Sequence, residues 1–259
     1  MTHWRASLTE QLRQLGVPRG GLVMPHGSLR AIGPVVGGVN TVVQSLLDAV
    51  GPEGTVAVYV DFEPFFTEDD NPEQIPVFDK RTAHAARDHG VLHETLRNWP
   101  GALRSDHPDA GVAAVGAEAE AIVRDHPFQF GYGPGTPFER IVDGGGQVLM
   151  LGAPLDTITL LHYAEHVARI PDKRVHRYRR KMPFPEGPRW VAFEEFDTSD
   201  PVHDALPLNC FEQIAQAYLA AGGGSSGRYG DAPAYLFPGK ELVRFAVEWL
   251  EGFPYPRPA

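Results

Sequence analysis

Apolar and polar positions alternate along this chain in a way that predicts strands and helices in turn. Apolar runs typical of buried strands lie at 22–24, 55–60, 111–115, 147–152 and 234–237, and two further strands are predicted at 175–182 and 189–196. Stripes with helical spacing lie at 40–50, 84–98, 117–124, 211–221 and 240–250. Interleaved strands and helices are typical of the α/β class. We therefore predict one α/β domain over residues 1–259, with a mixed central sheet flanked by helices.

Glycine and proline punctuate this pattern, with 28 and 24 copies respectively. They predict an irregular loop at 131–137 and a flexible loop at 222–227. The turn at 25–30 follows a predicted strand, and backbone amides in such a turn can hold a pyrophosphate. An arginine and a hydroxyl, Arg104 and Ser105, stand near another strand and are further candidates for contacts with phosphate.

The segment with most chemistry follows the predicted strand at 147–152. A Gly-Ala-Pro turn leads into a helix whose first turns carry Thr159, His162, Glu165 and His166. An α/β protein places its reactive groups at this kind of strand-to-helix junction. One interpretation makes His162 the general base of a transferase. The other makes His162-x-x-Glu165-His166 the helix of a zinc metallopeptidase, although zinc needs a third protein ligand that the segment does not specify.

Acidic residues outnumber basic ones by 33 to 23, which gives a net charge of −10 and argues against a nucleic-acid partner. Two acidic clusters follow predicted strands: one begins with Asp61 and Glu63, and the other contains Glu194 and Asp197. If both clusters face one cleft, they attract a polycation. The chain could then be an enzyme acting on a polycation, or a binder that only sequesters one.

The remaining composition limits where the protein works. No run approaches the ~18 apolar residues of a membrane span, and the chain opens without the apolar core of a signal peptide. Its one cysteine, Cys210, excludes an internal disulfide and a cysteine-based metal site. We expect a cytoplasmic protein without a membrane partner, as a monomer or homodimer.

Three motifs are more specific together than any one of them. They are His26–Gly33 with Val36–Gly38, Arg104–Ala110, and Leu151–Asp156 with Leu160–Glu165. In this order and spacing they resemble the aminoglycoside 3-N-acetyltransferases, most closely members that act on gentamicin- or kanamycin-like antibiotics. The resemblance continues through Lys173-Arg174 and 196–199 to 247–250, and so covers nearly the whole chain.

The resemblance implies a fold distinct from the GNAT acetyltransferases and a role in antibiotic resistance. The implied reaction transfers the acetyl group of acetyl-CoA to the 3-amino group of the 2-deoxystreptamine ring, without a metal. The implied contacts with the pantetheine and diphosphate of CoA are made by His26, Gly27, Ser28 and Leu29, with Arg104 and Ser105 as candidates for the phosphates. His162 is the implied base, and the acidic residues near Asp61 and Asp197 would hold the antibiotic. A member of the family can also acetylate a different amine.

The residues themselves suit this chemistry. An amine attacks a thioester only as the free base, so a neutral imidazole at His162 can accept its proton as the C–N bond forms. The carboxylates that could fix the tautomer of this imidazole are Glu165, Asp197 and Glu194, and the sequence does not choose among them. Backbone amides near Ser28 or the Thr159 hydroxyl could stabilise the oxyanion. The other ammonium groups of the antibiotic would pair with Asp61, Glu63 and the carboxylates around Asp197.

Overall fold

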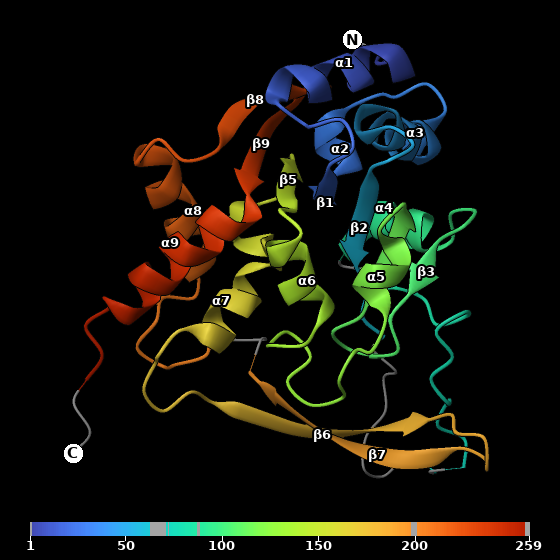
Figure 1. The fold of residues 1–259 in the computed structure, drawn as a ribbon, viewed down its shortest axis with the longest axis vertical. Coiled ribbons are helices and arrows are strands. Elements are labelled where there is room, and N and C mark those ends of the chain that lie inside the picture. Colours follow the sequence, from blue (N-terminus) through green and yellow to red (C-terminus); the bar gives the residue numbers. More distant parts are fainter. Residues whose placement is uncertain (1, 63–70, 72, 87–88, 198–200, 257–259) are drawn as a thin grey trace.

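A seven-stranded sheet forms the centre of the fold (Figure 1). The computed structural model describes residues 2–62, 71, 73–86, 89–197 and 201–256. The strands lie in the order β3 (Leu103–Arg104), β4 (Val112–Gly116), β2 (Thr55–Tyr59), β1 (Leu22–Gly27), β5 (Gln147–Leu151), β9 (Ala232–Pro238) and β8 (Ser225–Tyr229). β1 is parallel to β2 and β5, and the other pairs are antiparallel. The predicted α/β fold with a mixed central sheet is therefore confirmed.

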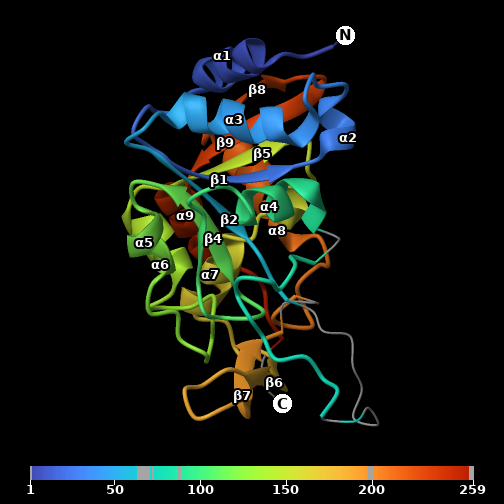
Figure 2. The ribbon, with the colours of Figure 1, turned by 90° about the vertical axis from the view of Figure 1, so that its right-hand side faces the viewer.

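Two layers of helices cover the sheet, with α1 and α3 on one side and α7 and α9 on the other (Figure 2). The first core cluster contains residues of α1 (Arg5–Leu15), α2 (Leu29–Ile32), α3 (Gly38–Val50) and α4 (Gly90–Arg97). The second contains residues of α5 (Ala119–Val123), α6 (Pro137–Asp143), α7 (Leu161–Val167), α8 (Cys210–Ala220) and α9 (Gly239–Glu251). Successive residues of β5 join alternate clusters, since side chains of a strand point to opposite faces. This double burial explains the continuous apolar runs in the sequence.

A two-stranded hairpin projects from one end of this sandwich (Figure 1). It consists of β6 (Val175–Met182) and β7 (Arg189–Phe196), which pair in antiparallel register with the predicted bounds. Met182 and Phe193 are buried in a third small cluster with Phe78 and Ala83. The hairpin is thereby packed against the segment that follows β2.

Two local predictions were wrong in extent or type, and the boundary of a third differs by one residue. The helix predicted at 84–98 begins only at Gly90, whose φ of +78° is a left-handed conformation that ends regular helix on its N-terminal side. The predicted loop at 222–227 overlaps the edge strand β8, which is exposed and therefore lacks an apolar pattern. The predicted loop at 131–137 ends in α6, a helix of seven residues that starts with Pro137. In the described part of the chain, no helix is long and apolar enough to cross a membrane.

Candidate active site

A cavity of about 800 Å³ lies where β1, β2 and β5 end. It is lined by His26, Gly27, Ser28, Leu29, Tyr59, Asp61, His89, Gly90, Val91, His93, Tyr132, Ala153, Pro154, Asp156, Thr157, Thr159 and His162. The carboxyl ends of parallel strands form a crevice in open α/β sheets, and ligands bind there. The sequence-predicted residues of the first and third motifs thus meet in one place.

A smaller cavity of about 190 Å³ adjoins the first. The two share Tyr59, Asp61 and Tyr132. The smaller one is also lined by Asp109, His176, Tyr178, Arg180, Glu195, Phe196 and Asp197. The β6–β7 hairpin therefore supplies half of the residues that line the smaller cavity, and four residues of this lining are carboxylates.

His162 and Glu165 form a dyad on α7. Nδ1 of His162 lies 2.8 Å from Oε2 of Glu165, whose side chain is only 4% exposed. An ionised carboxylate only accepts hydrogen bonds, so Nδ1 carries the hydrogen and Nε2 is left as the acceptor. The imidazole packs between the rings of Tyr132 and Phe211, at centroid distances of 5.0 and 4.8 Å. Of the three carboxylates that the sequence left open, Glu165 is the one in contact with His162.

The turn after β1 carries the predicted CoA-binding residues. Ser28 caps α2, because its Oγ accepts a hydrogen bond from the backbone N–H of Ala31 at 3.3 Å. Its own N–H donates to the carbonyl of Leu151 at 3.0 Å. His26 is buried, and Nε2 of its ring has no hydrogen-bond partner among the described residues. Burial, with His93 and His89 nearby, lowers the pKa of His26 well below its usual value, so the ring is neutral.

A buried, unpartnered ring nitrogen in a cavity wall calls for a polar ligand atom, since burying a polar group without a partner costs free energy. His26, the Ser28 turn and the segment around Pro154 therefore form a part of the cavity wall that suits a ligand with polar atoms.

Arg104 and Ser105 lie outside both cavities. The guanidinium of Arg104 donates to the carbonyls of Ala83 at 2.7 Å and Val60 at 3.3 Å. The hydroxyl of Ser105 lies 2.9 Å from Nδ1 of His126 and accepts from the N–H of Val112 at 3.0 Å. Both side chains are buried and bound to protein groups. This geometry favours a structural role, so their contact with CoA phosphates remains a prediction without structural support.

The acidic residues divide between the cavity and the outer surface. Asp61 is 6% exposed and lines both cavities, and Asp197 lines the smaller one. Glu194 lies outside both, 2.5 Å from the guanidinium of Arg177. Its neighbour Glu195 lines the smaller cavity instead, because adjacent residues of a strand point to opposite faces. Glu63, also predicted to bind substrate, lies outside the described residues.

Several further lining residues were given no role by sequence reasoning, among them Tyr59, Asp109 and Tyr132. The hydroxyls of Tyr59 and Tyr132 are 2.7 Å apart, and that of Tyr59 donates to the carbonyl of Asp109. The position of Asp109 beside His107-Pro108 in the second motif was the one signal available. Tyr59 lies in an apolar run of the sequence and Tyr132 lies between two glycines, and neither belongs to one of the three motifs.

The histidines proposed for zinc are each in contact with a carboxylate. His162 contacts Glu165, and Nε2 of His166 lies 2.8 Å from Oε1 of Glu195. Among the residues that the structure describes, no group of three or more His, Cys, Asp or Glu is arranged to hold a metal ion. The zinc metallopeptidase alternative therefore has no support from this geometry.

A buried carboxylate in contact with a histidine at the end of a mixed sheet, beside a cavity, is an arrangement typical of enzymes of the α/β class. The family model described as Aminoglycoside 3-N-acetyltransferase matches residues 24–251. The chain belongs to the aminoglycoside 3-N-acetyltransferase family.

Individual relatives agree with this assignment. The chain is 44% identical to aminoglycoside N(3)-acetyltransferase III of Pseudomonas aeruginosa, over 96% of this chain and 94% of the relative. It is 41% identical to aminoglycoside N(3)-acetyltransferase VIII of Streptomyces fradiae, over 95% and 91%. The predicted family and enzyme class, a transferase, are therefore confirmed.

Solved structures share the whole fold. A structure described as AAC-IIIb binary with CoASH superposes with a TM-score of 0.95 at 42% identity, covering 99% of this chain and all of that one (100%). A structure of sisomicin-bound AAC-VIa superposes with a TM-score of 0.90 at 37% identity, covering 97% and 98%. These matches confirm the predicted fold, and the first of these proteins, AAC-IIIb, binds CoASH.

Proposed function

We propose that this enzyme transfers the acetyl group of acetyl-CoA directly to the 3-amino group of the 2-deoxystreptamine ring of aminoglycosides, and so confers resistance to them. The observation that carries the proposal is the His162–Glu165 dyad in the wall of the larger cavity, next to a smaller cavity rich in carboxylates. The names of the relatives, and the CoASH and sisomicin complexes of AAC-IIIb and AAC-VIa, support the same two substrates.

His162 is the general base of this reaction. Nε2 accepts a proton from the attacking amine while the C–N bond forms and the C–S bond breaks, and CoA leaves as the thiolate, to which that proton can pass. Glu165 accepts the Nδ1 hydrogen and stabilises the imidazolium that forms. The transfer is direct, because the base lies against the cavity and no acyl-enzyme intermediate is required.

The donor side of the site is made by the turns after β1 and β5. His26, Gly27, Ser28 and Leu29 contact the pantetheine arm and the diphosphate. The N–H of Ser28 is already bound to Leu151, so the oxyanion of the tetrahedral intermediate is stabilised by the hydroxyl of Thr159. We therefore choose the Thr159 hydroxyl over the Ser28 amide, two oxyanion donors that the sequence left open.

The acceptor side is the smaller cavity. Asp61, Glu195 and Asp197 bind the ammonium groups that do not react, and Asp61 stands at the junction with the larger cavity. Several partly screened ion pairs suit a flexible polycation, because each contributes modestly and together they orient the ring. Glu194 takes no part, since it lies outside both cavities, where it pairs with Arg177.

The test is acetyl transfer by the purified protein, read as thiol release, with the acetylated nitrogen located by NMR. The substrates are gentamicin- and kanamycin-type drugs, the same drugs already acetylated at the 3-amino group, and spermidine as an amine that is not an aminoglycoside. We expect acetylation at the 3-amino group, no turnover of the blocked drugs, and rates unchanged by EDTA. Acetylation of spermidine alone would move the enzyme to another amine. Loss of activity in EDTA would restore the metal alternative, and drug binding without turnover would indicate a binder.

A further inference from the structure

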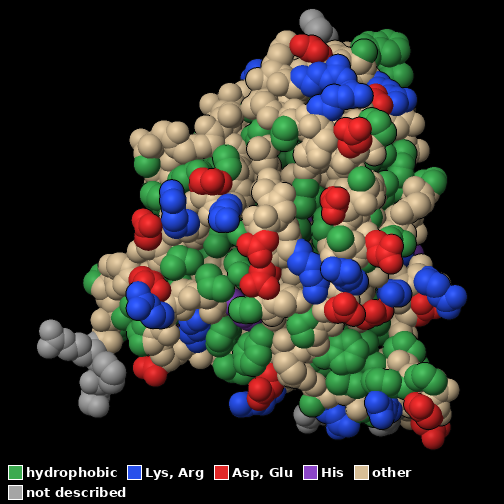
Figure 3. Space-filling model, viewed as in Figure 1, with side chains coloured by type: hydrophobic (Ala, Val, Ile, Leu, Met, Phe, Trp, Pro, Cys, Tyr) green, Lys and Arg blue, Asp and Glu red, His purple; other side chains and the backbone are tan. Residues whose placement is uncertain are grey.

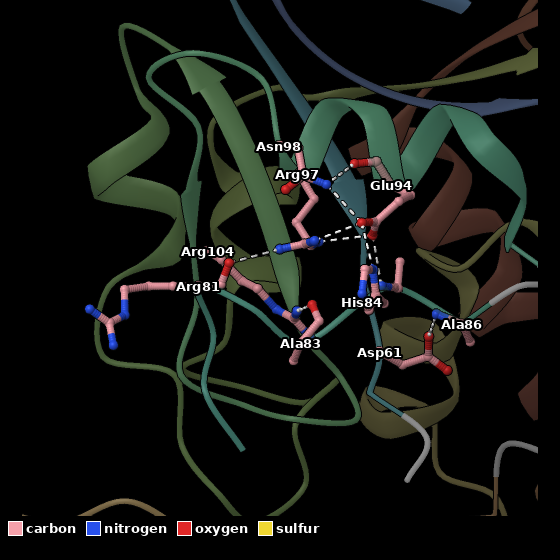
Figure 4. A network of polar contacts seen from close by, with 10 residues as sticks. Asp61, Arg81, Ala83, His84, Ala86, Glu94, Arg97, Asn98 and Arg104 are labelled. Atoms are coloured by element: carbon pink, nitrogen blue, oxygen red, sulfur yellow. Dashed lines mark hydrogen bonds and ion pairs between the residues drawn. The ribbon is translucent and has the colours of Figure 1, made fainter. Parts of the chain in front are cut away.

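Three charged side chains hold the backbone of residues 81–86, which runs past the end of β2 (Figure 4). The contacts on this segment are Arg97 Nη1 to Arg81 O at 3.2 Å, Arg104 Nη1 to Ala83 O at 2.7 Å, and Ala85 N to Glu94 Oε2 at 2.9 Å. The next backbone N–H, of Ala86, donates to Oδ1 of Asp61 at 3.2 Å. The last residue of the segment thus donates a hydrogen bond to a carboxylate of the candidate active site.

Arg104 joins this segment to the strand end that carries Asp61. Nη1 of its guanidinium donates to the carbonyl of Ala83, and Nη2 donates to that of Val60, the residue before Asp61. The planar fork of a guanidinium can bridge two carbonyls in fixed geometry, which a lysine ammonium cannot reproduce. Burial, together with repulsion from Arg97, lowers the pKa of Arg104 to about 10, so the bridge stays cationic at neutral pH.

Glu94 and Arg97 form the second anchor. The Arg97 guanidinium donates to Glu94 at 2.6 and 2.9 Å, and its side chain is 4% exposed. Glu94 also accepts from His84 Nδ1 at 3.0 Å and from Asn98 Nδ2 at 2.7 Å. Both residues belong to the regular helix α4, so the anchor is itself rigid.

Asp61 is fixed from both sides by this arrangement. Its backbone follows the carbonyl that Arg104 binds, and its carboxylate contacts Ala86 N and His89 Nε2, the latter at 2.9 Å. We propose that Arg104, assisted by the Glu94–Arg97 pair, is a positioning residue that holds the carboxylate of Asp61 at the junction of the two cavities and thereby sets the affinity for the cationic amine substrate. The inference rests on the proposed role of Asp61 in binding an ammonium group.

The first test is Arg104→Lys, which keeps the charge and removes the fork. Misplacing a binding group by a fraction of an ångström weakens substrate orientation, so we expect the KM for the aminoglycoside to rise about tenfold. The KM for acetyl-CoA should stay within about twofold, because no donor-side residue is touched. Arg140→Lys is the matched control, since Arg140 also binds backbone carbonyls, those of Ile122, Asp125 and Gly135, away from both cavities. It should change neither KM.

The second test is a double-mutant cycle with Asp61→Asn, using Glu94→Gln as an alternative if Arg104→Lys does not fold. If both residues act through Asp61, their effects on the aminoglycoside KM should nearly vanish in the Asp61→Asn background. Additive effects would overturn the inference. A rise confined to the KM for acetyl-CoA would also overturn it and would support a phosphate contact for Arg104. An unchanged KM in Asp61→Asn alone would overturn the ammonium site itself, and the inference with it.

Discussion

At the scale of single residues, the imidazole of His162 can work as a base only through Nε2, because Nδ1 is bound to Glu165. A buried carboxylate in this position fixes the tautomer and stabilises the charged ring, as in hydrolase triads. The same contact supports the proposed role of a helical histidine that on its own would indicate little. The i, i+3 spacing places both groups on one face of α7.

We predict that Glu165→Gln lowers kcat by about 10²-fold and His162→Ala by about 10²–10⁴-fold, with little change in the KM for acetyl-CoA. The measurement is steady-state kinetics at saturating aminoglycoside. Glu10→Gln on α1, which lies next to Gln14 on the surface, is the control and should be fully active. Normal turnover by His162→Ala would remove His162 from the role of base.

At the scale of elements, the turn after β5 leads into the segment that contains Thr159 and His162. Gly152 has a φ of +73°, and a Cβ there would lie 2.7 Å from the Cβ of Ala31 and 2.8 Å from that of Ala232. The turn therefore packs between α2 and β9 and sends the chain toward Pro154, Thr159 and α7. A glycine is required both by the backbone conformation and by the close approach.

We predict that Gly152→Ala destabilises the protein by about 2–4 kcal/mol, the sum of left-handed strain and overpacking. Gly145→Ala separates these two costs, because Gly145 has a φ of +68° and nothing within 4 Å of a Cβ. That control should lose only about 1–2 kcal/mol. Urea unfolding measures both, and equal losses in the two variants would show that packing around Gly152 is loose.

At the scale of the whole molecule, charge is distributed differently outside and inside. On the face shown in Figure 3, acidic and basic side chains are interspersed over the surface. The buried histidines include His26, His93, His107 and His126. Burial lowers the pKa of each, to about 4 for His93 and His126. The folded state therefore keeps them neutral where the unfolded chain takes up protons.

Stability should consequently fall on acidification. A histidine whose pKa drops from 6.5 to about 4 on folding contributes stability that is complete above pH 6.5 and is lost as the pH falls toward 4. The loss is about 1.4 kcal/mol per pH unit for each such group. Asp109 acts in the opposite direction, because burial raises its pKa from 3.8 to about 6 and its ionisation above that range costs stability. On acidification, the loss of stability from the four histidines exceeds the opposite contribution of the one aspartate.

We predict that the free energy of urea unfolding decreases by several kcal/mol between pH 7 and pH 5 (~1.4 kcal/mol per pH unit per buried histidine). His93→Gln should reduce this slope by about one proton, because the variant lacks a ring that is neutral in the folded protein and takes up a proton in the unfolded chain. A stability that is flat over this range would mean that the buried rings are protonated in the folded state.

The sequence by itself determined the class of the fold and singled out His162 as the candidate base. Alternation of apolar runs and helical stripes is a local property, and so are the strand–turn–helix context of His162 and the spacing to Glu165. These features can be predicted without knowledge of tertiary contacts, because they depend on residues three or four positions apart. The three motifs added the family, which the comparisons confirm.

Only the tertiary structure decided which side chains share a cavity. Adjacent residues of a strand face opposite ways, so whether Glu194 or Glu195 enters the site depends on which face of the hairpin packs inward. Arg104 likewise belongs to a motif that predicts a contact with phosphate. In the structure, however, its guanidinium donates hydrogen bonds to the carbonyls of Val60 and Ala83, which are distant in the sequence. Tyr59 and Tyr132 meet across 73 positions. Contacts between residues so far apart in the sequence depend on how the layers of the fold pack, and local sequence patterns do not contain that information.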